Sequence, residues 1–259
     1  MGNGFLLIGR RTINFIRRVG SVFMLLGKSL YYFKDIPRSG KLIVDQCFVI
    51  GNKSLPLIVI ISIFVGAVSA WQAAYQFTYI GAPLRYLGAA VGKAVVIELA
   101  PVLSALVVAG RVGAGIAAEV GTMRVTEQID ALDTMGISPV RYLVMPRLLA
   151  SSVMIPILTV FSNFVAITGA LLVSVIFVDL SSETFILGVK NSFKLFDIFG
   201  GLMKSFVFGA TIGLIGSHEG FYASGGARGV GRATTEAVVI ASVLILISDY
   251  IMAILLFRL

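Results

Sequence analysis

Charged side chains are scarce in this sequence, where Asp, Glu, Lys and Arg together make up 13% of 259 residues. An ordinary soluble domain carries about 25% charged residues and about 45–50% apolar ones. Here the hydrophobic share is 58%, so too little charge is left to cover a surface in contact with water. The composition therefore excludes a soluble globular domain and predicts an integral membrane protein.

Cysteine is almost absent, and Cys47 is the single one in the chain. A lone cysteine excludes an intramolecular disulfide, and the sequence offers no pair or cluster of typical metal ligands. Neither a Ser/His/Asp arrangement nor a pair of carboxylates suited to catalysis can be assembled from it. We therefore expect no catalytic residue, no metal and no cofactor, and a transport subunit rather than an enzyme.

A nucleotide-binding motif is also missing. The segment 226–231 has the glycine spacing of a phosphate-binding loop, but Arg232 and Ala233 follow where Lys and Ser or Thr would be needed. We interpret 225–232 as a flexible basic loop that contacts lipid headgroups. Any ATP hydrolysis would then have to come from another chain.

Long apolar runs dominate what is present, and a helix needs roughly 20 apolar residues to cross a bilayer. The sequence predicts an all-α membrane protein with a terminal segment at 1–53 and a five-span domain at 54–259. The five expected spans lie at about 56–79, 88–118, 148–178, 199–222 and 235–257.

The basic residues predict the orientation. Residues 1–53 hold nine Lys and Arg but only Asp35 and Asp45 as acids, so the positive-inside rule places this segment in the cytoplasm. Apolar and basic residues interleave near the N-terminus, as in a helix that lies in the membrane interface. Five crossings then put the C-terminus outside. We interpret the net charge of +8 as an adaptation to the anionic headgroups of the membrane, and we expect no nucleic-acid partner.

The most polar interior stretch is 119–147. Val125, Ile129 and Leu132 recur at helical spacing, with acids on the opposite side, which predicts a short amphipathic helix within about 122–136. Its acids suit a basic groove on a soluble protein, so we interpret it as a cytoplasmic coupling helix that contacts an ATPase. The candidate contact residues are Glu119, Arg124, Glu127, Gln128, Asp130 and Asp133.

Three charged residues fall inside expected spans: Glu98, Lys204 and Asp249. Each lies roughly five to ten residues from the outer end of its helix, or about 7–15 Å below the surface. A charge in hydrocarbon costs several kcal/mol unless it is paired or hydrated, so the three predict either structural ion pairs or a polar pocket for a lipid headgroup. The outer end of the first span adds Trp71, Tyr75 and Tyr79 to this candidate lipid-binding cavity.

Several of these segments resemble the MlaE/YrbE permease family. The resemblance rests on ELAPV at 98–102, AGRVG at 109–113, AEVGTMRVTEQIDAL at 118–132, LVMPR at 143–147 and RATT at 232–235. It also includes Pro139 with Val140 and Lys204 with Ser205, so it covers nearly all of the chain beyond the N-terminal helix.

The resemblance implies the permease subunit of an ABC transporter that moves phospholipids between the inner and outer membranes. It implies an inner-membrane homodimer, with a separate cytoplasmic ATPase and a hexameric ring of MCE-domain proteins on the periplasmic side. A STAS-domain protein binds the ATPase in some members. The family's lipid cavity opens outward at the dimer interface, and Glu98 and Lys204 occupy matching positions. Some relatives have an arginine where this chain has Ile97.

Two other functions stay open from the residues alone. A proton-coupled secondary lipid carrier could use Glu98 or Asp249 to carry the proton. A membrane-embedded lipid-modifying enzyme would need intramembrane catalytic acids, for which the same two residues are the candidates.

Overall fold

The regular elements of this protein are helices throughout the part that the structure describes. The computed structural model describes residues 2–257, and no strand occurs among them. The α-helices are α1 (Gly2–Tyr31), α2 (Ile36–Tyr79), α3 (Leu87–Ala94), α4 (Ala100–Val108), α5 (Ala114–Val125), α6 (Gln128–Thr134), α7 (Met145–Phe177), α8 (Ser182–Ser192), α9 (Leu195–Phe221) and α10 (Gly226–Leu256). The 3-10 turns are η1 (Tyr32–Asp35) and η2 (Leu84–Tyr86), and the π-helical turns are η3 (Val95–Leu99), η4 (Ala109–Gly113) and η5 (Val140–Val144).

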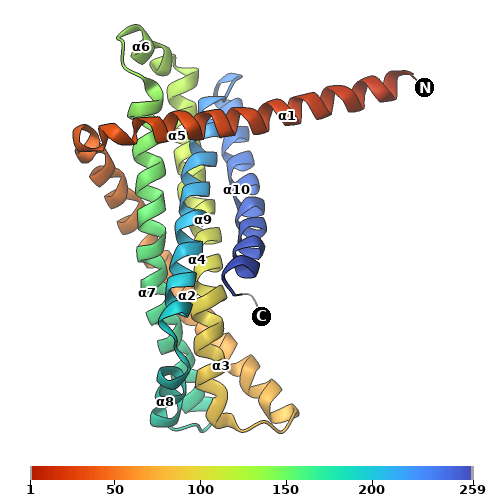
Figure 1. The fold of residues 1–259 in the computed structure, drawn as a ribbon, viewed down its shortest axis with the longest axis vertical. Coiled ribbons are helices and arrows are strands. Elements are labelled where there is room, and N and C mark those ends of the chain that lie inside the picture. Colours follow the sequence, from red (N-terminus) through yellow and green to blue (C-terminus); the bar gives the residue numbers. More distant parts are fainter. Residues whose placement is uncertain (1, 258–259) are drawn as a thin grey trace.

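Five helical stretches within the described residues are long and apolar enough to cross a membrane. They contain α2, the run from η2 to α5, the run from η5 to α7, α9 and α10. These stretches run along the long axis of the molecule, with α6 at one end and α8 at the other (Figure 1). We call these the α6 end and the α8 end. The predicted all-α membrane fold with five spans is confirmed.

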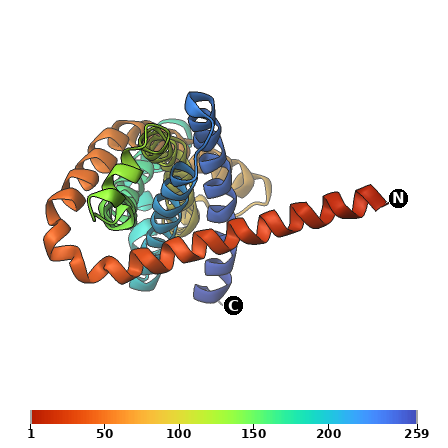
Figure 2. The ribbon, with the colours of Figure 1, turned by 90° about the horizontal axis from the view of Figure 1, so that it is seen from above.

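The N-terminal helix α1 does not join the bundle. It lies across the α6 end, roughly at right angles to the long axis, and its first turns extend beyond the other helices (Figures 1 and 2). The chain then turns through η1 and enters α2, which runs 44 residues without a break and contains Pro56. The division of the chain at residue 53 falls inside this helix and stays a prediction.

Packing between α2 and α7 depends on residues without bulky side chains. A Cβ atom on Gly66 would overlap the backbone of Ala166, and one on Gly169 would overlap the backbone of Ile63. Small residues let helix backbones approach closely in a membrane, where burial of apolar surface gives no driving force. Beside this contact, Ile58, Ile155 and Phe208 belong to a fully buried cluster that joins α2, α7 and α9.

The π-helical turns explain how two prolines fit into the spans. Proline lacks a backbone N–H, and its ring clashes with the carbonyl four residues earlier in a regular helix. Pro101 is the second residue after η3, and Pro146 is the second residue after η5. A π-helical turn widens the backbone at this point and is often found at functional sites. Glu98 lies in η3, so this local geometry helps to set its direction.

The glycine-rich segment is where the structure corrects the sequence-based expectation. Helix α10 begins at Gly226, so Arg228 and Arg232 belong to its first turns and not to a flexible loop. Two glycines with positive φ, Gly225 and Gly226, complete the connection from α9. The Arg232 side chain then donates a 2.7 Å hydrogen bond to Glu236 one turn along the helix, which favours helical structure here.

The predicted amphipathic segment 122–136 consists of the end of one helix and a short second helix. Helix α5 continues to Val125, Glu127 adopts a left-handed conformation, and α6 then runs from Gln128 to Thr134. Ile129 is buried against α5 and the start of the third span, whereas Asp130 and Asp133 are exposed. The amphipathic character is therefore confirmed, with Val125 assigned to α5.

Candidate functional site

Lys204 lies at the centre of a charged cluster in the α8 half of the bundle. Its Nζ atom donates a 2.6 Å hydrogen bond to Glu98 Oε1 and lies 3.0 Å from Asp249 Oδ1. The three side chains come from η3, α9 and α10, which are far apart in the sequence. The three charges therefore meet at one level of the bundle and form one cluster, while their depth below the membrane surface stays a prediction.

A close contact between two helices brings Lys204 to Glu98. A Cβ atom on Gly201 would overlap the carbonyl oxygen of Val96, so α9 lies directly against η3. Lys204 follows Gly201 by about one turn and therefore faces Glu98. The Lys204 Nζ atom also lies 5.7 Å from the ring centroid of Phe257, within reach of a cation–π interaction.

The three members of the cluster differ in accessibility. The Lys204 side chain is completely buried, the Asp249 side chain is 19% exposed and the Glu98 side chain is 41% exposed. Two carboxylates already neutralise the ammonium, so Lys204 offers no free positive charge to a phosphate in this conformation. Glu98 is therefore the most accessible member of the cluster.

The aromatic residues at the end of α2 are not part of this cluster. Trp71, Tyr75 and Tyr79 are all exposed, and the Trp71 ring packs edge-on against Phe177 of α7. Among the described residues no hydrogen bond, ion pair or ring contact joins these aromatics to Glu98, Lys204 or Asp249. Their assignment to a lipid cavity stays a prediction.

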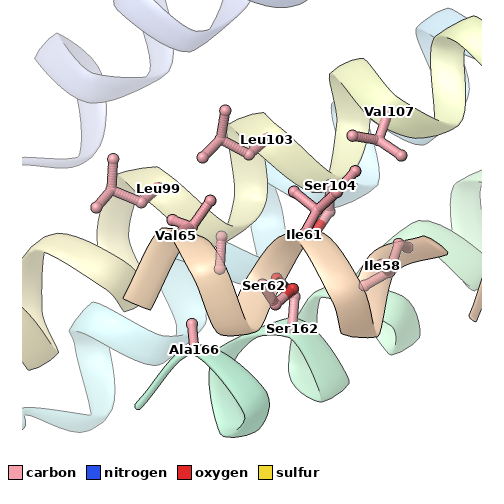
Figure 3. Close-up of a pocket in the computed structure, with 11 residues that line it drawn as sticks. Ile58, Ile61, Ser62, Val65, Leu99, Leu103, Ser104, Val107, Ser162 and Ala166 are labelled. Atoms are coloured by element: carbon pink, nitrogen blue, oxygen red, sulfur yellow. Dashed lines mark hydrogen bonds between the residues drawn. The ribbon is translucent and has the colours of Figure 1, made fainter. Parts of the chain in front are cut away.

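A small cavity lies between α2, α4 and α7, beside the helix that follows Glu98 (Figure 3). Aliphatic side chains line most of it, while Ser62 and Ser162 share a 2.8 Å hydrogen bond across it. The nearby Ser104 hydroxyl is buried and has no hydrogen-bond partner among the described residues. The volume of about 10 Å³ is the lower limit for one water molecule, so this cavity is not a lipid site.

At the α6 end, the predicted ATPase contacts divide into two groups. Arg124 Nη1 bonds Asp130 Oδ1 at 2.5 Å, which fastens α6 to α5. Glu119 accepts a 2.8 Å ion pair from Arg147, whose buried guanidinium also donates to the Leu143 carbonyl. Glu119 and Arg124 therefore hold this end together.

The other predicted contacts at this end are more open, although Asp130 keeps its bond to Arg124. Glu127 directly precedes α6, and Gln128, Asp130 and Asp133 lie within it; all four side chains are exposed. These four residues present polar groups to whatever lies beyond the α6 end. Their contact with an ATPase stays a prediction.

A second charged network was missed by the reading of the sequence. Arg18 of α1 bonds both Glu219 of α9 and Glu236 of α10. His218 bonds Glu219 at 2.9 Å and Ser21 at 2.8 Å. The basic residues of α1 indicated contact with lipid, and nothing in their spacing identified Glu219 or Glu236 as partners. This network joins α1 to α9 and α10.

Comparison with known proteins places the chain in a family. Residues 43–255 match the family described as Permease MlaE. A probable ABC transporter permease protein of Rickettsia felis is 40% identical over 251 residues, which cover 97% of this chain and 96% of the relative. A probable ABC transporter permease protein of Synechocystis is 40% identical over 93% of this chain and 92% of its own length.

A plant relative extends the comparison to chloroplasts. The chloroplastic protein TRIGALACTOSYLDIACYLGLYCEROL 1 of Arabidopsis thaliana is 38% identical over 203 residues, or 78% of this chain and 58% of the plant protein. The similarity to each of these relatives includes most of the five-span region that carries the charged cluster and α6. The chain therefore belongs to the MlaE family of ABC transporter permeases.

Proposed function

We propose that this chain is the membrane subunit of an ABC transporter that moves phospholipids between the inner and outer membranes. The observation that carries this proposal is the ionic cluster of Lys204, with Glu98 open on one side at membrane depth. A charged group facing acyl chains costs several kcal/mol, so such an exposed carboxylate calls for a polar occupant. A phospholipid headgroup in an outward-opening cavity meets this requirement.

A second copy of the chain would complete the cavity. Glu98 lies in η3 and Asp249 in α10, and α10 exposes a long apolar face that includes Val243, Leu246 and Tyr250. A homodimer that buries this side of the bundle would remove Glu98 from contact with hydrocarbon. The family resemblance supports the same arrangement, with a hexameric ring of MCE-domain proteins at the α8 end.

An ATPase subunit would bind the α6 end. The four exposed polar residues of α6 and its flank, Glu127, Gln128, Asp130 and Asp133, suit a basic groove on a soluble protein. This end would face the cytoplasm with the N-terminus, and the C-terminus would face the periplasm. In members that have a STAS-domain protein, that protein would bind the ATPase and not this chain.

The ion pairs of the α6 end define how motion would reach the lipid. The Arg124–Asp130 bond makes α6 and α5 move together, and Glu119 with Arg147 couples α5 to α7. The turns η4 and η3 interrupt the same span between α5 and Glu98. ATP-driven movement of α6 would therefore change the position of Glu98 and collapse the cavity, with the π-helical turns as flexible joints.

Substitution of Glu98 tests the headgroup pocket. In purified transporter, Glu98→Ala should reduce the amount of phospholipid that copurifies and abolish ATP-dependent transfer between vesicles. Glu183→Ala is the matched control, because Glu183 is an exposed carboxylate on α8 outside the cluster. Equal lipid content and transfer in both variants would contradict the proposed role of Glu98.

Charge reversal on α6 tests the ATPase contact. Asp133→Lys should weaken copurification of the ATPase at least tenfold, because an exposed carboxylate opposite a basic groove becomes a like charge. Glu183→Lys at the α8 end should have no such effect. Full ATPase binding by Asp133→Lys, with transfer unchanged, would show that α6 is not the docking element.

The two other functional classes predict different behaviour of the chain alone. Reconstituted without an ATPase, it should neither transport lipid under a pH gradient nor change the chemical structure of phospholipids. Transport under the gradient would identify a proton-coupled carrier. Turnover of phospholipid would identify an enzyme.

A further inference from the structure

A groove lined by apolar side chains and a few charged or polar ones lies in the α6 half of the bundle, on the side formed by α2 and the second span. Its volume is about 260 Å³, and it opens to the surface. Gln46 and Lys53 of α2 line one wall, and Arg111, Gly115 and Glu119 line the other. The groove shares none of these residues with the Lys204 cluster.

The charges of this groove are unbalanced. Lys53 and Arg111 are both exposed, and neither has an ion-pair partner among the described residues. The single carboxylate of the lining, Glu119, is already bound by Arg147 at 2.8 Å. The groove therefore presents two unpaired cations from two different helices, with the Gln46 amide beside them.

The depth of the groove follows from its neighbours. Ser21 of α1 bonds His218, which places α1 at that level of α9. Two residues earlier on α9, Gly216 packs against Gly113 and Ile116. Arg111 lies five residues from Ile116 toward the middle of the bundle, or about 8 Å at the rise of an α-helix. If α1 lies in the membrane interface, the two cations are at the depth of phosphate and glycerol groups.

We propose that this groove binds the headgroup phosphate of an anionic phospholipid in the leaflet that contacts α1. Arg111 and Lys53 would bind the phosphate oxygens, and Gln46 would donate its amide hydrogens to the glycerol or headgroup oxygens. Gly115 carries no side chain and leaves room beside Arg111. The proposal concerns a site separate from the Glu98 pocket and does not depend on ATP or on transport.

Basic residues near the cytoplasmic end of a span commonly extend to the interface without binding any particular lipid. Two observations favour a site over this general effect. The first is that Lys53 and Arg111 come from separate spans yet line the same groove. The second is that a neutral hydrogen-bond donor and a glycine lie beside them. Lys41, another exposed cation of α2, is not part of the lining, which makes it a suitable control.

A tryptophan reporter in the groove tests this proposal by binding alone. Trp71 is the single tryptophan of the sequence, so Trp71→Phe with Val49→Trp leaves one reporter, on the α2 wall of the groove. The full chain is reconstituted in vesicles of phosphatidylcholine with increasing dibrominated phosphatidylglycerol. Quenching of the tryptophan reports the relative affinity for the anionic lipid.

We expect phosphatidylglycerol to be preferred over phosphatidylcholine at least threefold in this background. Lys53→Gln with Arg111→Gln should bring the ratio close to one, whereas Lys41→Gln should leave the preference unchanged. The single variants Lys53→Gln and Arg111→Gln should each give an intermediate ratio. Circular dichroism of each variant distinguishes a loss of binding from a loss of folding.

Three outcomes would overturn the proposal. No preference in the parent background would show that the groove does not select anionic lipid. An equal loss of preference in Lys41→Gln would show a general surface-charge effect. A change in tryptophan emission on adding millimolar inorganic phosphate to vesicles of phosphatidylcholine, without any preference for phosphatidylglycerol, would show that the groove binds free phosphate and not a lipid headgroup.

Discussion

Two ionic clusters among the described residues are built alike and lie in different surroundings. In each, one cation binds two carboxylates: Lys204 binds Glu98 and Asp249, and Arg18 binds Glu219 and Glu236. The Lys204 side chain is completely buried in the α8 half, whereas the Arg18 side chain is 43% exposed at the α6 end, where Glu236 is partly exposed and only Glu219 is buried. Both clusters join α9 to α10. In the Lys204 cluster η3 adds a carboxylate, whereas in the Arg18 cluster α1 adds the cation.

The two clusters differ in how much their ion pairs contribute to the stability of the protein. An ammonium without access to water depends on its partners, and removing one side of a buried pair costs about 3–5 kcal/mol. An exposed ion pair contributes about 0–1 kcal/mol, because water and salt screen it. We therefore expect the Lys204 cluster to fix the arrangement of three spans, and the Arg18 network to hold α1 loosely enough to be displaced.

The largest effect should come from Lys204→Met, which leaves two carboxylates without a cation. We expect the free energy of unfolding to fall by about 3–5 kcal/mol and Tm to fall on the order of 10 °C. Lys190→Met is the matched control, because Lys190 is exposed on α8. The measurement is thermal unfolding of the purified protein in detergent, and equal Tm values in the two variants would show that the cluster is not structural.

A double-mutant cycle should sharpen the role of the two acids. Glu98→Gln or Asp249→Asn alone leaves Lys204 with one carboxylate, so each should have a moderate effect on stability. The double variant leaves the ammonium without any counter-charge, and its loss should exceed the sum of the two by about 0.5–3 kcal/mol. Additive losses in the same unfolding assay would show that the three groups do not act as a unit.

Arg18→Gln should have a smaller effect on overall stability, about 1 kcal/mol or less. Its consequence should appear locally, since α1 loses its bonds to α9 and α10 while the bundle keeps its core. Hydrogen exchange over residues 18–31 should accelerate, with little change in α7 or α9. Unaltered exchange in α1 would show that apolar contacts, such as those of Leu25 with Val144 and Leu148, hold this helix alone.

The smallest expected effect is that of salt. At 1 M ionic strength the Debye length is about 3 Å, so the stability difference between wild type and Arg18→Gln should shrink toward zero. The difference between wild type and Lys204→Met should persist, because the ammonium is shielded from ions in solution. If salt reduced the stability differences of Arg18→Gln and Lys204→Met from wild type to the same extent, the two clusters would not differ in their shielding from solvent.

Much of the architecture followed from the sequence because lipid imposes simple rules. Apolar length predicted the five spans, and the polarity of 119–147 predicted the helix that became α6. The same rules could not identify the helical start of α10, since Gly225 and Gly226 make the turn and the residues after them are free to continue as helix. Nor could they find the partners of Arg18, which lie about 200 residues away.

The sequence by itself determined that this protein belongs in a membrane, how many times it crosses, and that Glu98, Lys204 and Asp249 lie at a similar level of the bundle. Hydropathy has this power because it constrains position along the membrane normal. It does not constrain the rotation of a helix about its own axis. Only the tertiary structure decided that Lys204 faces both acids, through the contact of Gly201 with Val96, and that Glu98 stays open.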